Sequence, residues 1–296
     1  MNPGRPDGAS SPAPAAIDRR SFLGALPGVV LLAAGSDGSR RSANGLRRRP
    51  LEAFGIQLYT LRAPLADDLI GTLAAVAAIG YREVEFAGLH GLTPRQMRTR
   101  LDGAGLRAAS SHHGLEEVRG AWSETLEGAR ELGQGMVVVP SIPASERGRE
   151  GLRRVATDLN RAGEAARAAG LRLGYHNHDW ELAPLADGTR PMDLLLERTE
   201  PGLVDWQMDV FWTVHGGADP ARYLRVEGGR VTSLHVKDRT AAGRMVDIGD
   251  GIIDFASLVP LAEGAGLRHA FVEHDDPDDP LASARRSLAH LRAILG

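Results

Sequence analysis

The chain has 296 residues and a formal net charge of −3, with 43% hydrophobic and 25% charged residues. This length allows one large domain or two small ones, and the charge gives no overall attraction to nucleic acid or acidic membranes. The chain contains no cysteine. Thiol catalysis, disulfides and Cys-ligated zinc or iron–sulfur sites are therefore excluded.

The first fifty residues carry the features of an export signal. Asp18-Arg-Arg-Ser-Phe-Leu23 precedes a moderately apolar stretch, residues 24–34, which is followed by small residues. This order is typical of a secretory signal, and the paired arginines resemble the twin-arginine export signal. The apolar stretch is too short and too rich in Gly and Ala to be a good spanning helix, so we expect no stable membrane insertion. We predict a signal peptide and linker over residues 1–50 and a periplasmic or extracellular protein; an amphipathic N-terminal helix with incidental arginines is the alternative.

From Phe54 onward, short apolar runs alternate with Ala/Leu/Arg-rich stretches of helical spacing. The predicted strands cover residues 55–59, 83–86, 106–110, 136–139, 171–176, 204–209, 231–236 and 270–273. Eight strand–helix units at intervals of about 30 residues match a (β/α)8 TIM barrel. The competing doubly wound sheet needs a Gly-rich phosphate loop after its first strand, where this chain has Thr60-Leu-Arg-Ala-Pro64. We therefore predict one α/β barrel over residues 51–296.

Glycines mark the predicted returns from helix to strand. Helices are predicted over 68–79, 153–169 and 255–263, and the last ends at Gly264 or Gly266. A small–Gly–apolar pattern closes four helices, as expected where a glycine takes the left-handed position after the last turn. These returns are Ile79-Gly80-Tyr81, Ala104-Gly105-Leu106, Ala169-Gly170-Leu171 and Ala265-Gly266-Leu267.

Metal-competent side chains gather at the ends of the predicted strands, which face one common mouth in a barrel. Seven of the ten histidines lie in these segments: His112, His113, His176, His178, His215, His235 and His274. Asp209, His235 and Glu273 lie near the last residues of their strands and are predicted metal ligands, with His176 as the best fourth. Imidazole and carboxylate donors together suit Mn²⁺, Fe²⁺, Co²⁺, Ni²⁺ or Zn²⁺ better than Mg²⁺ or Ca²⁺. Each residue alone also has a structural alternative, such as a carboxylate that caps the next helix.

Four further residues are predicted to contact a substrate. Lys237 shares the strand parity of His235 and could hold an anionic or hydroxyl-rich group; a surface ion pair with Asp238 or Asp275 is the alternative. Trp212 is a candidate wall of the pocket, because aromatic faces stack on sugars, although core packing explains a tryptophan equally well. Glu85 and His112 complete the set, at the ends of the second and third predicted strands.

Four motifs together resemble the sugar phosphate isomerase/epimerase family with the xylose isomerase-like TIM barrel. They are Tyr175-His-Asn-His-Asp-Trp-Glu181, Met208-Asp-Val-Phe-Trp-Thr-Val-His-Gly-Gly217, Leu234-His-Val-Lys-Asp238 and Phe271-Val-Glu-His-Asp275. The resemblance covers residues 54–296 and implies one divalent ion, often Mn²⁺, bound at the ends of strands five to eight. The family's ligand order is Glu, Asp, His, Glu. Its last three members fall on Asp209, His235 and Glu273, and its first falls on His176.

His176 is a departure from that order, because two glutamates in the family's ketose epimerases both bind metal and move protons. The resemblance implies an isomerase or epimerase that abstracts a proton next to a carbonyl of a sugar, with a metal-stabilised enediolate. Glu273 is then the expected base, Glu181 or His178 a second base, and His178 or His112 an acid. The alternative within the family is a lyase, hydratase or dehydratase acting on a 3-keto glycoside or related polyol.

Two other functions compete with a sugar-converting enzyme. Abasic-site endonucleases share this barrel but need more metal ligands and a basic DNA-binding surface. The chain offers no evident basic stripe after its first fifty residues and has an acidic segment, Asp275–Asp279. We therefore expect a small-molecule sugar partner and no nucleic acid; a non-catalytic sugar-binding protein and a homo-oligomer remain open.

Overall fold

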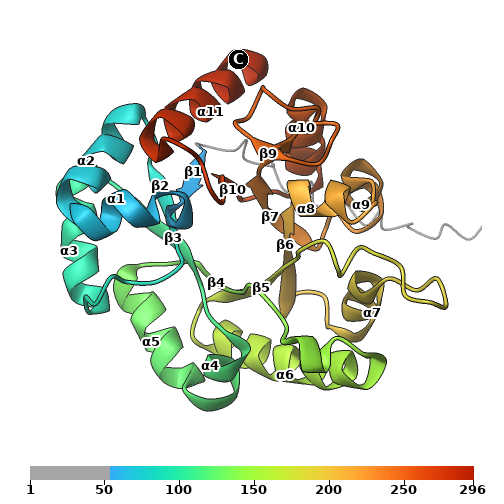
Figure 1. The fold of residues 1–296 in the computed structure, drawn as a ribbon. Helices are drawn as coiled ribbons and strands as arrows, with labels where there is room; N and C mark the ends of the chain where they lie inside the picture. The colour runs from blue at the N-terminus through green and yellow to red at the C-terminus, as the bar shows by residue number, and fades with distance from the viewer. Residues whose placement is uncertain (1–53) are drawn as a thin grey trace, which may run out of the picture. The chain divides into compact units, whose positions relative to one another are not determined.

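The computed structural model describes residues 54–296, in which eight parallel strands close into a barrel inside a ring of helices (Figure 1). Strands adjacent in the barrel follow one another in sequence, and the last strand, β10, pairs with both β7 and β1. The predicted (β/α)8 TIM barrel is confirmed. The predicted signal peptide and linker, residues 1–50, lie outside the described residues.

The barrel strands agree closely with the predicted runs. They are β1 (Gly55–Gln57), β2 (Glu83–Phe86), β3 (Arg107–His112), β4 (Met136–Val139), β5 (Arg172–His176), β6 (Val204–Asp209), β7 (Val231–Val236) and β10 (His269–Val272). β1 ends early because the Gln57 side chain accepts a hydrogen bond from the Tyr59 amide and caps the 3-10 helix η1 (Leu58–Leu61). β3 continues two residues further than predicted and ends on His112.

Several helices begin at a side-chain cap or end at a left-handed glycine. The helices are α1 (Arg62–Asp67), α2 (Leu69–Ile79), α3 (Pro94–Ala104), α4 (Leu115–Gly120), α5 (Trp122–Leu132), η2 (Ala144–Glu146), α6 (Arg149–Ala168), α7 (Pro191–Arg198), α8 (Val210–His215), α9 (Pro220–Val226), α10 (Phe255–Ala265) and α11 (Pro280–Leu295). Gly80 follows α2 with a φ of 117°, as predicted. Of the two glycines predicted to end α10, Gly266 is the one that follows the helix, with a φ of 115°, because Gly264 lies inside it.

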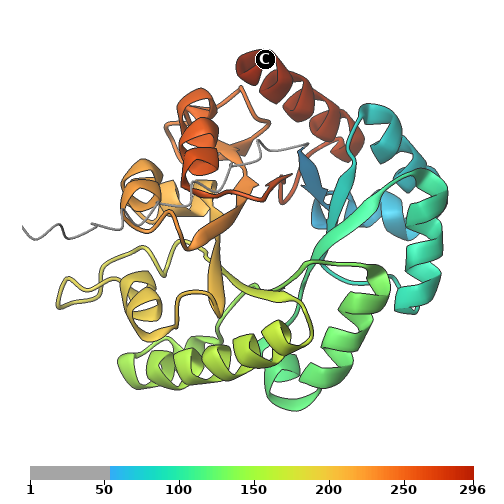
Figure 2. The same ribbon diagram turned by 180° about the vertical axis from the view of Figure 1, so that it is seen from behind.

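The outer helices pack apolar stripes against the barrel. In α6 the buried residues recur at helical spacing and include Leu152, Val155, Leu159, Ala162 and Ala166. Figure 2 shows α6 as a long helix along the outside of the barrel. Its Gly163 lies against the segment before β6, where an added Cβ would stand 2.5 Å from the Leu203 carbonyl oxygen.

A small antiparallel hairpin follows β7 and joins β8 (Asp238–Arg239) to β9 (Met245–Val246). Asp238 holds the connection that comes next, because its carboxylate accepts hydrogen bonds from the amides of Gly249, Gly251 and Ile253. Among residues 54–296, none of the helices has the length and apolarity to cross a membrane.

Two helical glycines test the packing of the outer layer. Gly163→Ala is expected to lower the free energy of unfolding by about 1–3 kcal/mol, because the new methyl group clashes with a backbone carbonyl. Gly103→Ala in α3 is the matched control: an added Cβ there meets nothing within 4 Å, so the better helix former should stabilise by about 0.5–1 kcal/mol. Urea denaturation of both variants checks this, and equal effects would contradict the packing argument.

Candidate metal and substrate site

Four neighbouring strands bring the predicted metal ligands together. His176 and Asp209 end β5 and β6, His235 is the next-to-last residue of β7, and Glu273 directly follows β10. These strands are adjacent in the barrel, and all four side chains are buried. We call His176, Asp209, His235 and Glu273 the ligand cluster.

The donor atoms of the ligand cluster converge. One donor atom each from Asp209, His235 and Glu273 lies within 4.8 Å of the other two. His235 Nδ1 lies 2.6 Å from Glu273 Oε2, and His176 Nε2 lies 3.8 Å from Asp209 Oδ2. Asp209, His235 and Glu273 therefore form one group of converging donors, and His176 adjoins it beside Asp209.

Lys237 points into the same cluster, as its strand parity predicted. Its Nζ lies 3.0 Å from Asp209 Oδ2, 2.8 Å from Glu273 Oε2 and 2.9 Å from Asp275 Oδ1. The ion pair with Asp275 is thus present, but it is buried rather than on the surface, since the Lys237 side chain is 3% exposed. The ammonium group is held at the edge of the ligand cluster, between that cluster and the mouth residue Asp275.

The donor set fits a divalent cation. Asp209 Oδ2 is buried and has no hydrogen-bond partner in the described structure; Lys237 contacts it only as an ion pair. Four carboxylates, Glu85, Asp209, Glu273 and Asp275, surround two cationic groups, Lys237 and His235, so negative charge remains in excess. A buried excess of negative charge is costly unless a cation balances it. Mixed imidazole and carboxylate donors are also the set that Mn²⁺ and Zn²⁺ accept.

Burial and mutual charge shift the pKa values of the ligand cluster in opposite directions. Burial raises the pKa of Asp209 to about 6 despite the neighbouring Lys237 ammonium. Burial opposes ionisation of Glu273 and His235 too, but Lys237 and His235 lower the pKa of Glu273 to about 2. Glu85 and Glu273 likewise overcome burial and raise the pKa of His235 to about 10. Burial and the adjacent imidazoles lower the pKa of His176 well below its ordinary value, so its ring is neutral.

Glu85 lies inside the barrel beside His235 of the ligand cluster, and its contacts argue against the predicted substrate contact. Its side chain is fully buried. The carboxylate accepts hydrogen bonds from residues of four strands: Gln57 Nε2 (2.9 Å), Ser110 Oγ (2.5 Å), Gln207 Nε2 (2.7 Å) and His235 Nε2 (2.5 Å). Burial tends to raise the pKa of Glu85, but His112 and His235 lower it well below its ordinary value, so it is ionised.

The neutral members of this network were not predicted from the sequence. Gln57, Ser110 and Gln207 are fully buried polar residues inside strands. Ser110 has the parity of His112, and Gln207 has the parity of Asp209. This shared parity indicates that Ser110 and Gln207 face the same side of the barrel as His112 and Asp209, because alternate residues of a strand face the same side.

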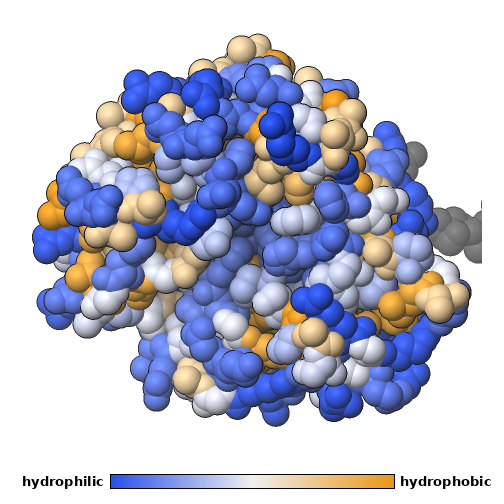
Figure 3. Space-filling model, in the orientation of Figure 1, coloured by the Kyte–Doolittle hydropathy of each residue, from blue (hydrophilic) through white to orange (hydrophobic). Residues whose placement is uncertain are grey.

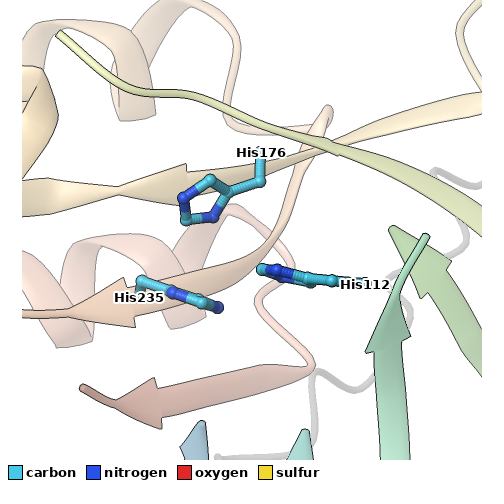
Figure 4. Close-up of side chains that lie close together, drawn as sticks. All are labelled: His112, His176 and His235. Atoms are coloured by element: carbon cyan, nitrogen blue, oxygen red, sulfur yellow. The ribbon is translucent and has the colours of Figure 1, made fainter. Parts of the chain in front are cut away.

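His112, His176 and His235 form a second group of converging donors (Figure 4). Their ring centroids are 4.5–5.4 Å apart. Acceptor oxygens lie between the rings: His112 Nε2 is 2.9 Å from Gln207 Oε1 and 3.1 Å from Glu85 Oε1. His112 is also partly exposed, so it remains a candidate for substrate contact.

His178 and Trp212 flank the ligand cluster on its exposed side. The His178 ring lies 5.1 Å from the His176 ring and 5.7 Å from the Trp212 ring, measured between centroids. Both side chains are only partly buried, and the Trp212 indole Nε1 has no partner among the described residues. Figure 3 shows hydrophilic residues gathered at the middle of the face in view, with hydrophobic residues in scattered patches.

Glu181 does not join this group. Its carboxylate accepts hydrogen bonds from the Tyr175 hydroxyl (2.5 Å) and the His178 amide (2.9 Å), and it is fully buried. Tyr175 has the opposite strand parity to His176 and packs in the hydrophobic core. The contacts of Glu181 therefore argue against the predicted role of second base and indicate a clamp for the turn after β5.

The curated proteins similar to this chain include inosose dehydratases. The inosose dehydratase of Geobacillus kaustophilus strain HTA426 is 27% identical over 227 residues, which cover 63% of this chain and 73% of that enzyme. The match to the inosose dehydratase of Geobacillus thermodenitrificans strain NG80-2 spans only 47% of that enzyme, at 27% identity over 42% of this chain.

Solved structures show the same barrel. A sugar phosphate isomerase/epimerase from Parabacteroides distasonis ATCC 8503 superposes with a TM-score of 0.73 at 27% identity, over 82% of this chain and 95% of that one. The 3-keto-D-glucoside 4-epimerase of E. coli superposes with a TM-score of 0.63 at 18% identity, over 81% and 99%, which shows the fold alone. The model of one family, the xylose isomerase-like TIM barrel, matches residues 73–294, and the chain belongs to that family.

Proposed function

We propose that this chain is a divalent-metal-dependent enzyme that removes a proton next to the carbonyl of a sugar or keto sugar. One observation carries the proposal: the ligand cluster unites four buried donors at the carboxyl ends of adjacent strands, with negative charge in excess. The similarity to an inosose dehydratase and to a sugar phosphate isomerase/epimerase supports the substrate class.

Each residue has a role that follows from its contacts. The ligand cluster would hold the ion, for which Mn²⁺ is the first expectation, with Zn²⁺, Co²⁺, Fe²⁺ or Ni²⁺ as alternatives. When bound, such an ion polarises a substrate carbonyl and stabilises an enediolate oxygen. Glu273 would accept the proton from the adjacent carbon, and Lys237, 2.8 Å from Glu273 Oε2, would orient that carboxylate and bind a substrate oxygen.

The exposed side of the site supplies the acid and the walls. His112 is a partly exposed imidazole beside the ligand cluster, where it would protonate an oxygen that leaves or an enediolate. Burial and Lys237 lower the pKa of the neighbouring His178 to about 4, so its neutral ring suits a base. Trp212 would stack on a sugar ring next to His178. Substrate would thus lie between Glu273 on one side and imidazoles on the other.

This arrangement favours reactions that need one carboxylate base. Glu181 and Glu85 are both held in buried hydrogen-bond networks, so neither is free to act as a second base opposite Glu273. Loss of water from a keto sugar or 3-keto glycoside removes one α-proton and expels one β-hydroxyl, and isomerisation on one face also needs one base. Epimerisation is the second candidate; the similarity to the Parabacteroides protein favours it, and it would require His178 as the opposite base.

The N-terminal pattern bears on the substrate. We propose that residues 1–50 direct the protein out of the cytoplasm through the twin-arginine route. Free or oxidised sugars are then better candidates than sugar phosphates, which are mostly confined to the cytoplasm. The ligand cluster and its proposed chemistry do not depend on this placement.

Metal binding is the first test. The purified full-length chain is expected to bind one equivalent of Mn²⁺ or Zn²⁺ in titration calorimetry. Asp209→Asn should weaken binding by on the order of 100-fold or more, because it removes a charged donor. Asp275→Asn, which removes a carboxylate that touches only Lys237 in this group, is the control and should weaken binding by less than about tenfold. Equal losses would contradict the ligand assignment.

Proton abstraction is the second test. With metal and an inosose, a 3-keto glucoside or a ketose in D2O, NMR should show solvent deuterium entering next to the carbonyl, or loss of water. Glu273→Gln should lower the rate by about 10²–10⁴-fold. A non-catalytic sugar-binding protein would show saturable binding and no exchange in either form. An epimerised product with deuterium at the inverted carbon would select the second candidate.

Glu181 gives a prediction about pH and stability. Burial raises the pKa of Glu181 to about 7, although its hydrogen bonds oppose the rise. An acid whose pKa is higher in the folded state loses stability as pH rises, here between about 4 and 8. Glu181→Gln has no such group, so its free energy of unfolding relative to wild type should rise by about 2–3 kcal/mol from pH 4.5 to pH 8. Urea denaturation of both proteins at both pH values checks this. A difference in free energy of unfolding between variant and wild type that does not change with pH would contradict it. The metal affinity of the variant should equal that of wild type.

A further inference from the structure

We infer that Glu85 is a positioning residue that determines which ring nitrogen each histidine of the ligand cluster presents to the ion. The inference rests on the proposed function, because it assumes that His176 and His235 bind a metal. It concerns the step before chemistry: how a neutral imidazole with two candidate nitrogens is held with one lone pair toward the ligand cluster.

Glu85 acts on His235 directly. Glu85 Oε1 lies 2.5 Å from His235 Nε2, and an ionised carboxylate can only accept hydrogen bonds. His235 Nε2 must therefore carry a proton. When an ion replaces the second proton of the ring, the lone pair that binds it is therefore on Nδ1, which lies 2.6 Å from Glu273 Oε2, on the ligand side. Such carboxylate–histidine pairs orient metal ligands in many sites.

Glu85 acts on His176 through Gln207. Glu85 Oε2 accepts from the Gln207 amide nitrogen at 2.7 Å, so the Gln207 carbonyl oxygen must point the other way. That oxygen lies 3.1 Å from His176 Nδ1 and accepts its proton. The lone pair of His176 is therefore on Nε2, which faces Asp209 Oδ2 at 3.8 Å. One carboxylate thus gives the two histidines opposite tautomers.

The position of Glu85 leaves no other role open to it. Gln57 Nε2 and Ser110 Oγ donate to its two oxygens from the remaining sides, and its side chain is fully buried. The carboxylate is held by β1 and β3 while it contacts β6 and β7. It can neither reach a substrate nor rotate without the loss of several buried hydrogen bonds.

A glutamine at this position would disturb one histidine whichever way it points. If its NH2 group replaces Oε1, it faces the His235 Nε2 proton, and the ring must present Nε2 as an acceptor. If the NH2 group replaces Oε2, it faces the Gln207 amide, which must turn and point its own NH2 group at His176 Nδ1. In either case one histidine carries its proton on the nitrogen needed for the ion.

The experiment combines Zn²⁺ calorimetry and imidazole NMR on the full-length chain. Glu85→Gln should weaken Zn²⁺ binding by about 10–100-fold, as other losses of such partners do. Glu83→Gln is the matched control: it makes the same change two residues earlier on β2, where Glu83 contacts His269 and Arg107 and none of the ligand cluster. Its Zn²⁺ affinity should equal that of wild type.

Long-range ¹H–¹⁵N spectra of the Zn²⁺-loaded wild type test the tautomers without any substitution. They should show a proton on Nε2 of His235 and on Nδ1 of His176, with the other nitrogen of each ring bound to Zn²⁺. Gln207→Leu should weaken binding too, and it should leave the His235 assignment unchanged, since His176 is the one histidine of the ligand cluster that contacts Gln207 Oε1.

Three results would overturn the inference while the proposed function stands: wild-type affinity in Glu85→Gln, equal losses in Glu85→Gln and Glu83→Gln, or the same ring nitrogen bound in both histidines. A wild-type chain that binds neither Zn²⁺ nor Mn²⁺ would overturn the proposed function itself. If Glu85→Gln does not fold, Gln207→Leu and the wild-type spectra decide the question.

Discussion

The cost of burying charge inside the barrel is the constraint on which this structure depends. Glu85, Asp209 and Glu273 are carboxylates with exposures of 6% or less, and each must be paired or hydrogen-bonded to remain ionised there. Lys237 and His235 supply positive charge, and Gln57, Ser110 and Gln207 supply neutral donors. Each of these side chains depends on the others. Removing one partner would leave a buried carboxylate or imidazole unpaired, and the free-energy cost of that unpaired group exceeds the stabilisation that the pair contributes.

The polar interior divides the barrel into two regions. Between the strands and the helices the core is apolar, and residues such as Leu159, Val204 and Leu234 hold the barrel closed. Inside the barrel toward the mouth, residues of the usual branched apolar kind give way to the Glu85 network and, above it, the ligand cluster. The apolar layer supplies most of the folding free energy. Packing of the apolar layer therefore compensates for the free-energy cost of burying these charges.

Much of this could be predicted from the sequence, and the limits are physical. Strand ends and strand parity were enough to place Asp209, His235, Glu273 and Lys237 on one mouth, because both follow from local periodicity. The depth of Glu85 was not predictable, because it depends on the stagger between β2 and β3, where the register shifts between Val84 and Glu85. Depth decides whether a carboxylate meets substrate or supports the ligands.

Glu181 and the neutral donors show two further limits. Parity stops applying where β5 ends at His176, so the direction of Glu181 depended on a turn that the sequence does not define. The sequence does not mark Gln57, Ser110 and Gln207 as functional, because uncharged polar residues in short strands match no catalytic or metal-binding pattern. Their role exists only once a buried carboxylate needs donors, and that need arises from the three-dimensional arrangement.

In the proposed site, His176 stands at the strand end where the family resemblance implies a glutamate ligand. A neutral imidazole in place of a carboxylate removes one negative charge and one group able to take a proton from carbon. The remaining carboxylate, Glu273, then lies on one side of the site, and its partner Lys237 keeps it ionised. The imidazole in turn needs an acceptor for its second nitrogen, which a carboxylate ligand would not. Gln207, aligned by Glu85, meets that need, so the proposed ligand His176 and the buried network beside it would act as one functional unit.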